Sequence, residues 1–60
     1  MSGYGIKVET DTGRKVWLTE DGTTTVKTKA MRFDSEAGAT MHRNILARQN
    51  PHATLTVHKL

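Results

Sequence analysis

Apolar and polar residues alternate with a period of two at the start of the chain. Tyr4, Ile6 and Val8 are separated by glycine and charged residues, which is the pattern of a strand with one buried face. A turn sequence over residues 11–14 leads to a second β-rich stretch, residues 15–19. Both stretches predict strands of a small sheet.

The next segment predicts a hairpin and a third strand. The Asp21-Gly22 pair follows the second stretch, and Asp-Gly between two apolar stretches favours a tight β-turn. Residues 23–28 are rich in threonine and contain Val26, so they have high strand preference. Residues 29–33 fit either an extension of this strand or a turn, and Phe33 is expected in the core in both cases.

A helix is predicted between Asp34 and Pro51. Asp34 and Ser35 are both good N-cap residues, and the Asn50-Pro51 pair ends the helix. An apolar stripe with a spacing of four residues is expected to face the sheet; it consists of Ala37, Met41 and Ile45, with Leu46 beside them.

Alternation returns at the end of the chain. Ala53, Leu55 and Val57 are separated by Thr54, Thr56 and His58, which predicts a closing strand. The order β-β-β-α-β predicts a single α+β domain over residues 1–60. Its sheet has three to four mainly antiparallel strands, and one helix packs on one face of the sheet.

Composition fits a lean folded domain. The 60 residues include no cysteine, so neither a disulfide nor a thiolate metal site can form. No apolar stretch approaches the roughly 20 residues needed to cross a bilayer, and no signal-peptide pattern begins the chain. We therefore expect a cytoplasmic protein that does not enter a membrane.

The sequence resembles a style of small uncharacterised protein common in phage and prophage genomes. The resemblance is carried by Tyr4-Gly5-Ile6-Lys7, by the Ala-x-x-Phe element with its capped helix start (residues 30–37), and by the terminal strand. It implies an origin in a mobile element and an α+β fold. It implies no activity, and no site residue is transferred from it.

Residue types that support catalysis or metal binding are scarce. No HExxH, P-loop, GxGxxG or GxSxG pattern is present, and the acidic residues fall mainly in turns or at the helix cap. His42, His52 and His58 lack a ligand-pair spacing. We therefore expect no enzyme activity, no catalytic residue, no cofactor and no metal.

The face of the sheet opposite the helix is more informative. If Ile6, Val16 and Leu55 face the helix, alternation puts Lys7 and Trp17 on the other side. A tryptophan on an open polar face is a candidate binding anchor. The candidate binding residues are the tryptophan and the basic residues expected around it: Lys7, Arg14, Lys15, Trp17, Lys27 and Lys29. A one-residue shift in register would instead bury Trp17.

Two kinds of partner fit this face. The first is a host or self protein, held by the open sheet face or by an unpaired strand edge, as for a phage or mobile-element accessory factor. The alternative is nucleic acid, because Lys7, Lys15 and Lys27 around Trp17 suit phosphate contact with base stacking and the net charge is +3. A homodimer that buries the open faces is a further possibility.

Overall fold

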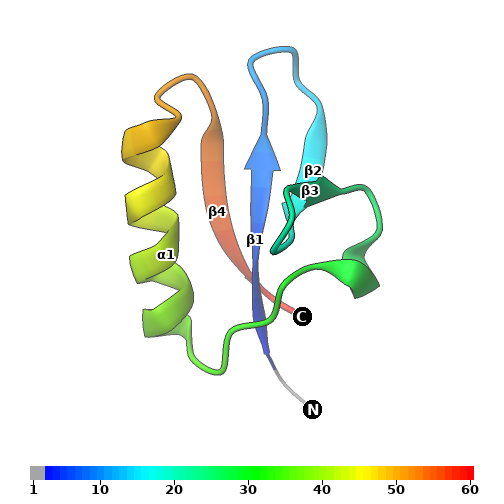
Figure 1. The fold of residues 1–60 in the computed structure, drawn as a ribbon, viewed down its shortest axis with the longest axis vertical. Coiled ribbons are helices and arrows are strands. Elements are labelled where there is room, and N and C mark those ends of the chain that lie inside the picture. Colours follow the sequence, from blue (N-terminus) through cyan, green and yellow to red (C-terminus); the bar gives the residue numbers. More distant parts are fainter. Residues whose placement is uncertain (1–2) are drawn as a thin grey trace.

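The computed structural model describes residues 3–60 and confirms the predicted order of elements (Figure 1). The elements are β1 (Tyr4–Glu9), β2 (Lys15–Leu18), β3 (Thr23–Thr24), the 3₁₀ helix η1 (Lys27–Lys29), α1 (Glu36–Gln49) and β4 (Thr54–Lys59). The four strands form one antiparallel sheet in the order β3-β2-β1-β4. The α+β class is therefore the one that the hydrophobic pattern predicts.

Strand β1 lies between β2 and β4, and its register fixes the two faces of the sheet. Val8 is opposite Val16 of β2 and Leu55 of β4. Lys7 is opposite Trp17 and Thr56. Because directly opposite residues share a face, the apolar positions of three strands gather on one side and the polar positions on the other.

The third strand is much shorter than predicted. Residues 23–28 were expected to pair, but only Thr23 and Thr24 do so. The Thr24 hydroxyl accepts a hydrogen bond from the Val26 amide at 3.1 Å, a local turn that competes with the ladder. Val26 is 43% exposed, so it lies outside both the strand predicted for it and the core.

After η1 the chain returns to β1 and pairs with it. The amide of Met31 donates to the carbonyl of Leu18 at 2.9 Å, and Tyr4 and Phe33 exchange two backbone hydrogen bonds of 3.0 and 2.8 Å. Strand β2 pairs with β1 only from Lys7 to Glu9. The segment that contains Phe33 lies beside the start of β1 instead. Phe33 is half-buried, and the centroid of its ring is 5.3 Å from that of His42. It therefore lies at the edge of the core, whereas the sequence predicts it inside the core.

Helix α1 begins as the sequence predicts. The hydroxyl of Ser35 accepts a hydrogen bond from the Gly38 amide at 3.1 Å, which satisfies one of the free amides of the first turn. At the other end, the Asn50 amide donates to the Leu46 carbonyl at 2.9 Å. Within residues 3–60 no helix combines the length and the apolar character that crossing a membrane requires.

The face that α1 turns to the sheet differs from the predicted one. Met41 is 67% exposed and Ile45 is 53% exposed, and Ala37 is exposed as well. Ala39, at 0% exposure, is instead the point of closest packing, with Leu46 half-buried on the same side. The small side chain of Ala39 lets the helix approach the sheet, so the predicted stripe is wrong except for Leu46.

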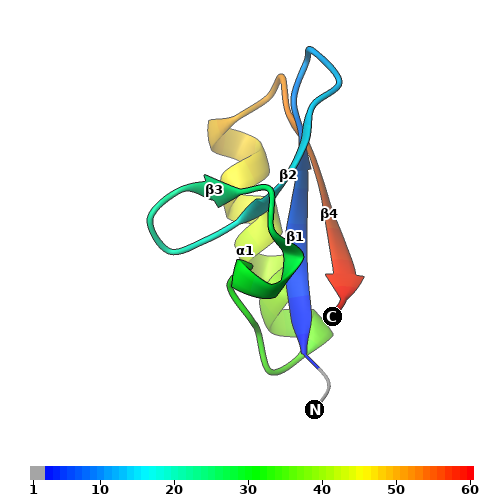
Figure 2. The same ribbon diagram turned by 90° about the vertical axis from the view of Figure 1, so that its right-hand side faces the viewer.

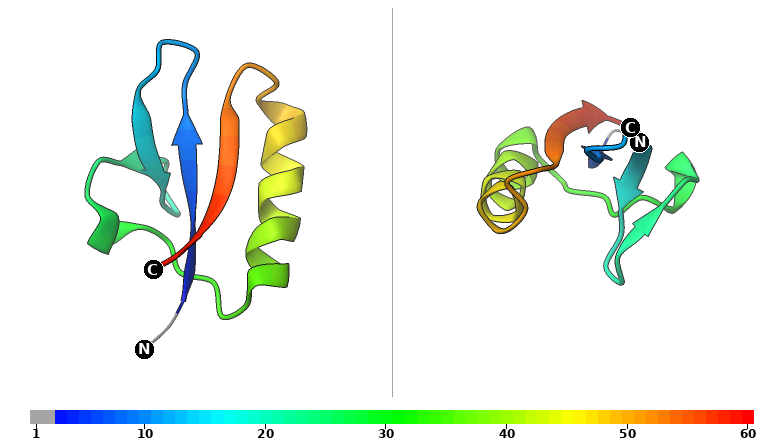
Figure 3. Two further views of the ribbon diagram at one scale, coloured as in Figure 1. Left: turned by 180° about the vertical axis from the view of Figure 1, so that it is seen from behind. Right: turned by 90° about the horizontal axis from the view of Figure 1, so that it is seen from above.

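The core is small and lies on the side of the sheet that faces α1. Its buried apolar residues are Ile6, Val16, Ala30, Ala39 and Leu55. Helix α1 contacts β4 and β1, while the β2–β3 hairpin curves towards the same side of the sheet (Figures 2 and 3). Between them an apolar hollow remains, bordered by half-buried Val8, Leu18 and Leu46.

The observed helix orientation predicts unequal effects of two matched substitutions. We expect Ala39→Gln to lower the free energy of unfolding by about 2 kcal/mol or more, because it places a larger polar side chain in the core. Met41→Gln should change it by no more than about 0.5 kcal/mol, as is usual at exposed positions. Urea denaturation measures both. Equal losses for the two variants would contradict this orientation.

Candidate binding face around Trp17

The side of the sheet away from α1 carries polar side chains around one tryptophan. The strands β1, β2 and β4 contribute alternate residues to it, and η1 contributes a lysine from the end of the sheet. We call this surface the Trp17 face and define it by Lys7, Lys15, Trp17, Lys27, Thr56 and His58. Glu9 and Thr54 lie on the same side at its far end.

Trp17 occupies the middle of this surface. It pairs with Lys7 on one side and with Thr24 on the other. Val16 is 7% exposed and points into the core, whereas Trp17 is half-buried. The register is therefore the one that leaves Trp17 outside the core, and β1 and β3 hold the backbone of Trp17 from both sides.

Two lysine ammonium groups lie near the indole ring. The Nζ of Lys7 is 5.5 Å from the ring centroid, and the Nζ of Lys27 is 5.9 Å from it. Both distances are within the range of a cation–π attraction. Lys7 comes from β1 and Lys27 from η1, so residues distant in sequence meet at one aromatic ring.

His58 completes the surroundings of the ring from β4. Its imidazole meets the indole edge-on, with the ring centroids 5.8 Å apart and the planes at 73°. The Nε2 of His58 is also 2.9 Å from the hydroxyl of Thr56. This contact holds the imidazole beside Trp17. The Trp17 face therefore has hydrogen-bond donors and acceptors around the indole ring.

The charge of this side of the sheet is mainly positive. A hollow beside Trp17 is lined by lysines, hydroxyls, one imidazole and one carboxylate: Lys7, Glu9, Lys15, Thr54, Thr56 and His58. Lys15 lies opposite Glu9 in the β1–β2 ladder, which places one acid against one base. Lys7 and Lys27 remain directed towards Trp17, so an approaching anion meets positive charge at the ring.

Two of the predicted binding residues lie elsewhere. Arg14 is on the turn after β1 and lines a hollow with Val8 and Val16, which is on the helix side of the sheet. Lys29 is exposed on η1, and the lysine of η1 that lies near the Trp17 ring is Lys27. Of the six predicted residues, the structure brings together Lys7, Lys15, Trp17 and Lys27.

Sequence reasoning placed Thr56 and His58 on the correct side of the sheet but did not select them as binding residues. Alternation of the last strand carries this information. What alternation does not reveal is that β4 pairs directly with β1. That pairing puts Thr56 opposite Lys7 and brings His58 to Trp17.

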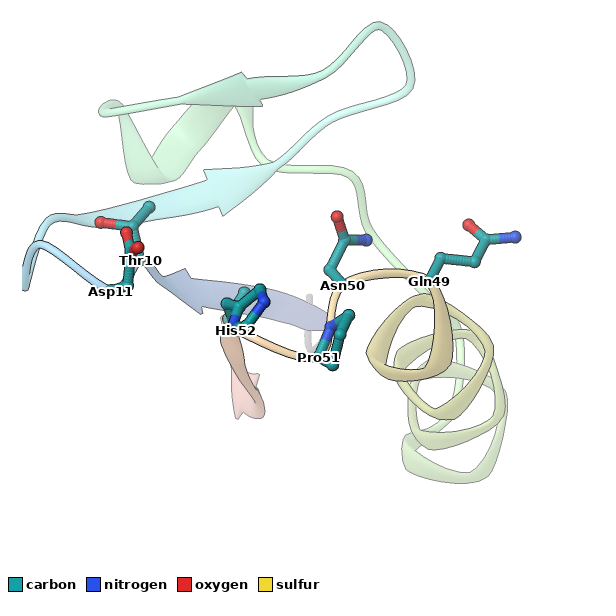
Figure 4. A pocket seen from close by; sticks show the side chains of 7 residues that line it. Thr10, Asp11, Gln49, Asn50, Pro51 and His52 are labelled. Carbon is teal, nitrogen blue, oxygen red and sulfur yellow. The ribbon is translucent and has the colours of Figure 1, made fainter.

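Another hollow lies between the turn after β1 and the end of α1 (Figure 4). Thr10 and Asp11 stand on one side of it and Gln49 on the other, and their side chains do not converge. The Thr10 hydroxyl is engaged in its own turn, 2.9 Å from the Thr12 hydroxyl and 3.1 Å from the Arg14 amide. Within residues 3–60, no group of three histidine or acidic residues is placed to hold a metal ion.

The contact between Lys7 and Trp17 predicts an energetic coupling. In a double-mutant cycle with Lys7→Met and Trp17→Leu, we expect a coupling of about 0.5–1 kcal/mol, because an exposed cation–π pair has this strength. Lys15→Met serves as the control, since Lys15 shares the face, whereas the ammonium groups placed near the ring are those of Lys7 and Lys27. A coupling for Lys15 as large as for Lys7 would contradict the specific contact.

Comparison with protein-family models, with curated proteins and with solved structures finds no match to this chain. No relative therefore supplies a function, and the resemblance to small phage and prophage proteins rests on the sequence elements quoted above.

Proposed function

We propose that this chain is a non-enzymatic binding module that captures a protein partner on the Trp17 face. The observation that carries the proposal is Trp17 itself, a large aromatic outside the core that is surrounded by Lys7, Lys27 and His58. Tryptophan is enriched at the energetic centres of protein interfaces. The module acts as an accessory factor of the phage or mobile-element type that its sequence resembles.

The surroundings of Trp17 suit a partner with acidic side chains. A carboxylate that approaches the ring meets Lys7 and Lys27, while the threonine hydroxyls and His58 offer hydrogen bonds. Complementary charge of this kind accelerates encounter and selects the partner. The indole supplies apolar contact area at the centre, and the polar groups form the rim.

Nucleic acid is a second candidate, favoured by the two ammonium groups beside the ring. Lysines around an aromatic suit phosphate contact with base stacking. Trp17 is however the one phenylalanine, tyrosine or tryptophan on this side among residues 3–60, because Phe33 lies against His42 of α1 and Tyr4 is on the helix side by alternation with Ile6. Successive bases stack on successive aromatics, so we rank the protein partner first.

The two candidates are separated by site-specific crosslinking. A photo-crosslinking residue replaces Thr56, which is exposed on the Trp17 face, and irradiation follows in a lysate of cells that produce the chain. We expect an adduct that survives nuclease, disappears with protease and is lost on additional Trp17→Ser, because the partner is a protein anchored by the indole.

The control variant carries the same crosslinker at Thr40, which is exposed on α1, and it should not form this adduct. Short single-stranded DNA and RNA provide the competing test at low and at physiological ionic strength. Binding of these oligonucleotides that weakens steeply with salt, together with loss of the Thr56 adduct on nuclease treatment, would replace the protein partner by nucleic acid.

A further inference from the structure

The sheet ends in two very different edges. At one edge β3 contains two residues and gives way to a local turn. At the other, β4 contains six residues, from Thr54 to Lys59, without proline. A long edge strand presents unpaired amides and carbonyls that can accept another strand. Strand β4 is therefore the edge at which the sheet can be extended.

The hydrogen bonds of β1 determine which groups of β4 point outward. The Leu60 amide donates to the carbonyl of Gly3 at 2.7 Å, whereas Tyr4 uses its amide and carbonyl on the opposite side, with Phe33. Backbone groups alternate in direction along an antiparallel strand. His58 and Thr56 therefore bond to β1, and Val57 and Lys59 turn their amides and carbonyls to the open edge.

Arg43 of α1 lies at one end of the part of β4 whose backbone groups are open to a partner. The carbonyl of Leu55 also points outward, and it accepts a hydrogen bond of 3.2 Å from the Arg43 Nη1. Arg43 is half-buried, and its guanidinium also donates to the side-chain oxygen of Asn44. The carbonyl of Leu55 is thus already satisfied, and a positive charge lies at the edge just before Val57.

A second copy of the chain does not fit this edge. Pairing β4 with β4 about a two-fold axis places both α1 helices on the same face of the joined sheet. The two strands would lie about 5 Å apart, and each helix contacts its own β4 (Figures 1 and 3). In Figures 1 and 3, α1 lies on the side of β4 away from β1. Packed helices need about 8–10 Å between their axes, so the two helices of such a dimer would occupy the same space.

We propose that the edge of β4 at Val57 and Lys59 receives an extended segment of the protein partner that carries acidic side chains. The inference rests on the proposed protein-binding function and adds where the partner's backbone lies. Arg43 and Lys59 supply the complementary positive charge along the edge. The added strand continues the sheet, so its outward side chains lie next to Thr56 and His58 and reach the Trp17 face.

The orientation of the edge is tested first, with two neighbouring exposed residues. Proline lacks an amide and is tolerated on an edge strand only where that amide faces solvent. Lys59→Pro should therefore retain the dispersed NMR spectrum of the folded protein, whereas His58→Pro removes a bond to β1 and should lose it. In the unchanged protein, the Val57 and Lys59 amides should exchange with solvent much faster than those of Thr56 and His58. The reverse order would overturn the proposal.

Binding is tested with a short extended peptide in which glutamate alternates with valine. At millimolar concentration we expect it to shift and protect the amides of Val57 and Lys59, and to bind at least about tenfold more tightly than the analogue with lysine in place of glutamate. Lys59→Pro should abolish this binding, while Met41→Gln, on the exposed side of α1, should not alter it. Equal binding by both peptides, or unchanged binding by Lys59→Pro, would overturn the edge as the docking site.

The outcomes also separate this inference from the proposed function. If the Thr56 crosslink to a protein persists in the Lys59→Pro variant, the partner uses the Trp17 face alone and the edge inference is wrong. If the crosslink depends on nucleic acid, the proposed function itself fails. A dimer in sedimentation that Lys59→Pro dissociates would identify a second copy as the occupant and overturn the proposal for a partner segment.

Discussion

The pairing of β1 with both β2 and β4 is the constraint on which the other features depend. It places Ile6, at 0% exposure, in the centre of the core. Since successive residues of a strand point to opposite faces, burial of Ile6 and Val16 obliges Lys7 and Trp17 to lie outside. The core and the Trp17 face are thus two consequences of one register, and a shift of one residue would exchange them.

The strands β1, β2 and β4 were predictable because each has a simple sequence pattern. Alternation located β1 and β4, strand preference located β2, and the Ser35 hydroxyl marked the start of α1. The third strand was not predictable from residue preference, since the Thr24 hydroxyl bonds the Val26 amide and turns the chain away. Strand preference indicates which residues favour a strand, but here the hydrogen bond from the Val26 amide to the Thr24 hydroxyl determines where the strand ends.

The helix orientation shows a second limit of hydrophobic pattern. Two stripes of residues along α1 could have packed against the sheet. The stripe that contains Met41 and Ile45 is the more apolar of the two. The stripe that packs contains Ala39 and Arg43, because a small side chain permits close approach and the guanidinium bonds the Leu55 carbonyl. Lys27 illustrates the same point at the binding face, since it reaches Trp17 from η1 and not from the predicted strand. Contacts of this kind depend on tertiary structure and leave no periodic signal.

The position of β4 in the sheet also governs how the protein folds. Strand β1 ends at Glu9 and its second neighbour begins at Thr54, so residues 10–53 form the loop that this pairing closes. Contacts between distant segments slow folding because the loop must close before they form. Until Leu55 leaves the ribosome, the core around Ile6 lacks one side, and the nascent chain cannot complete its native structure.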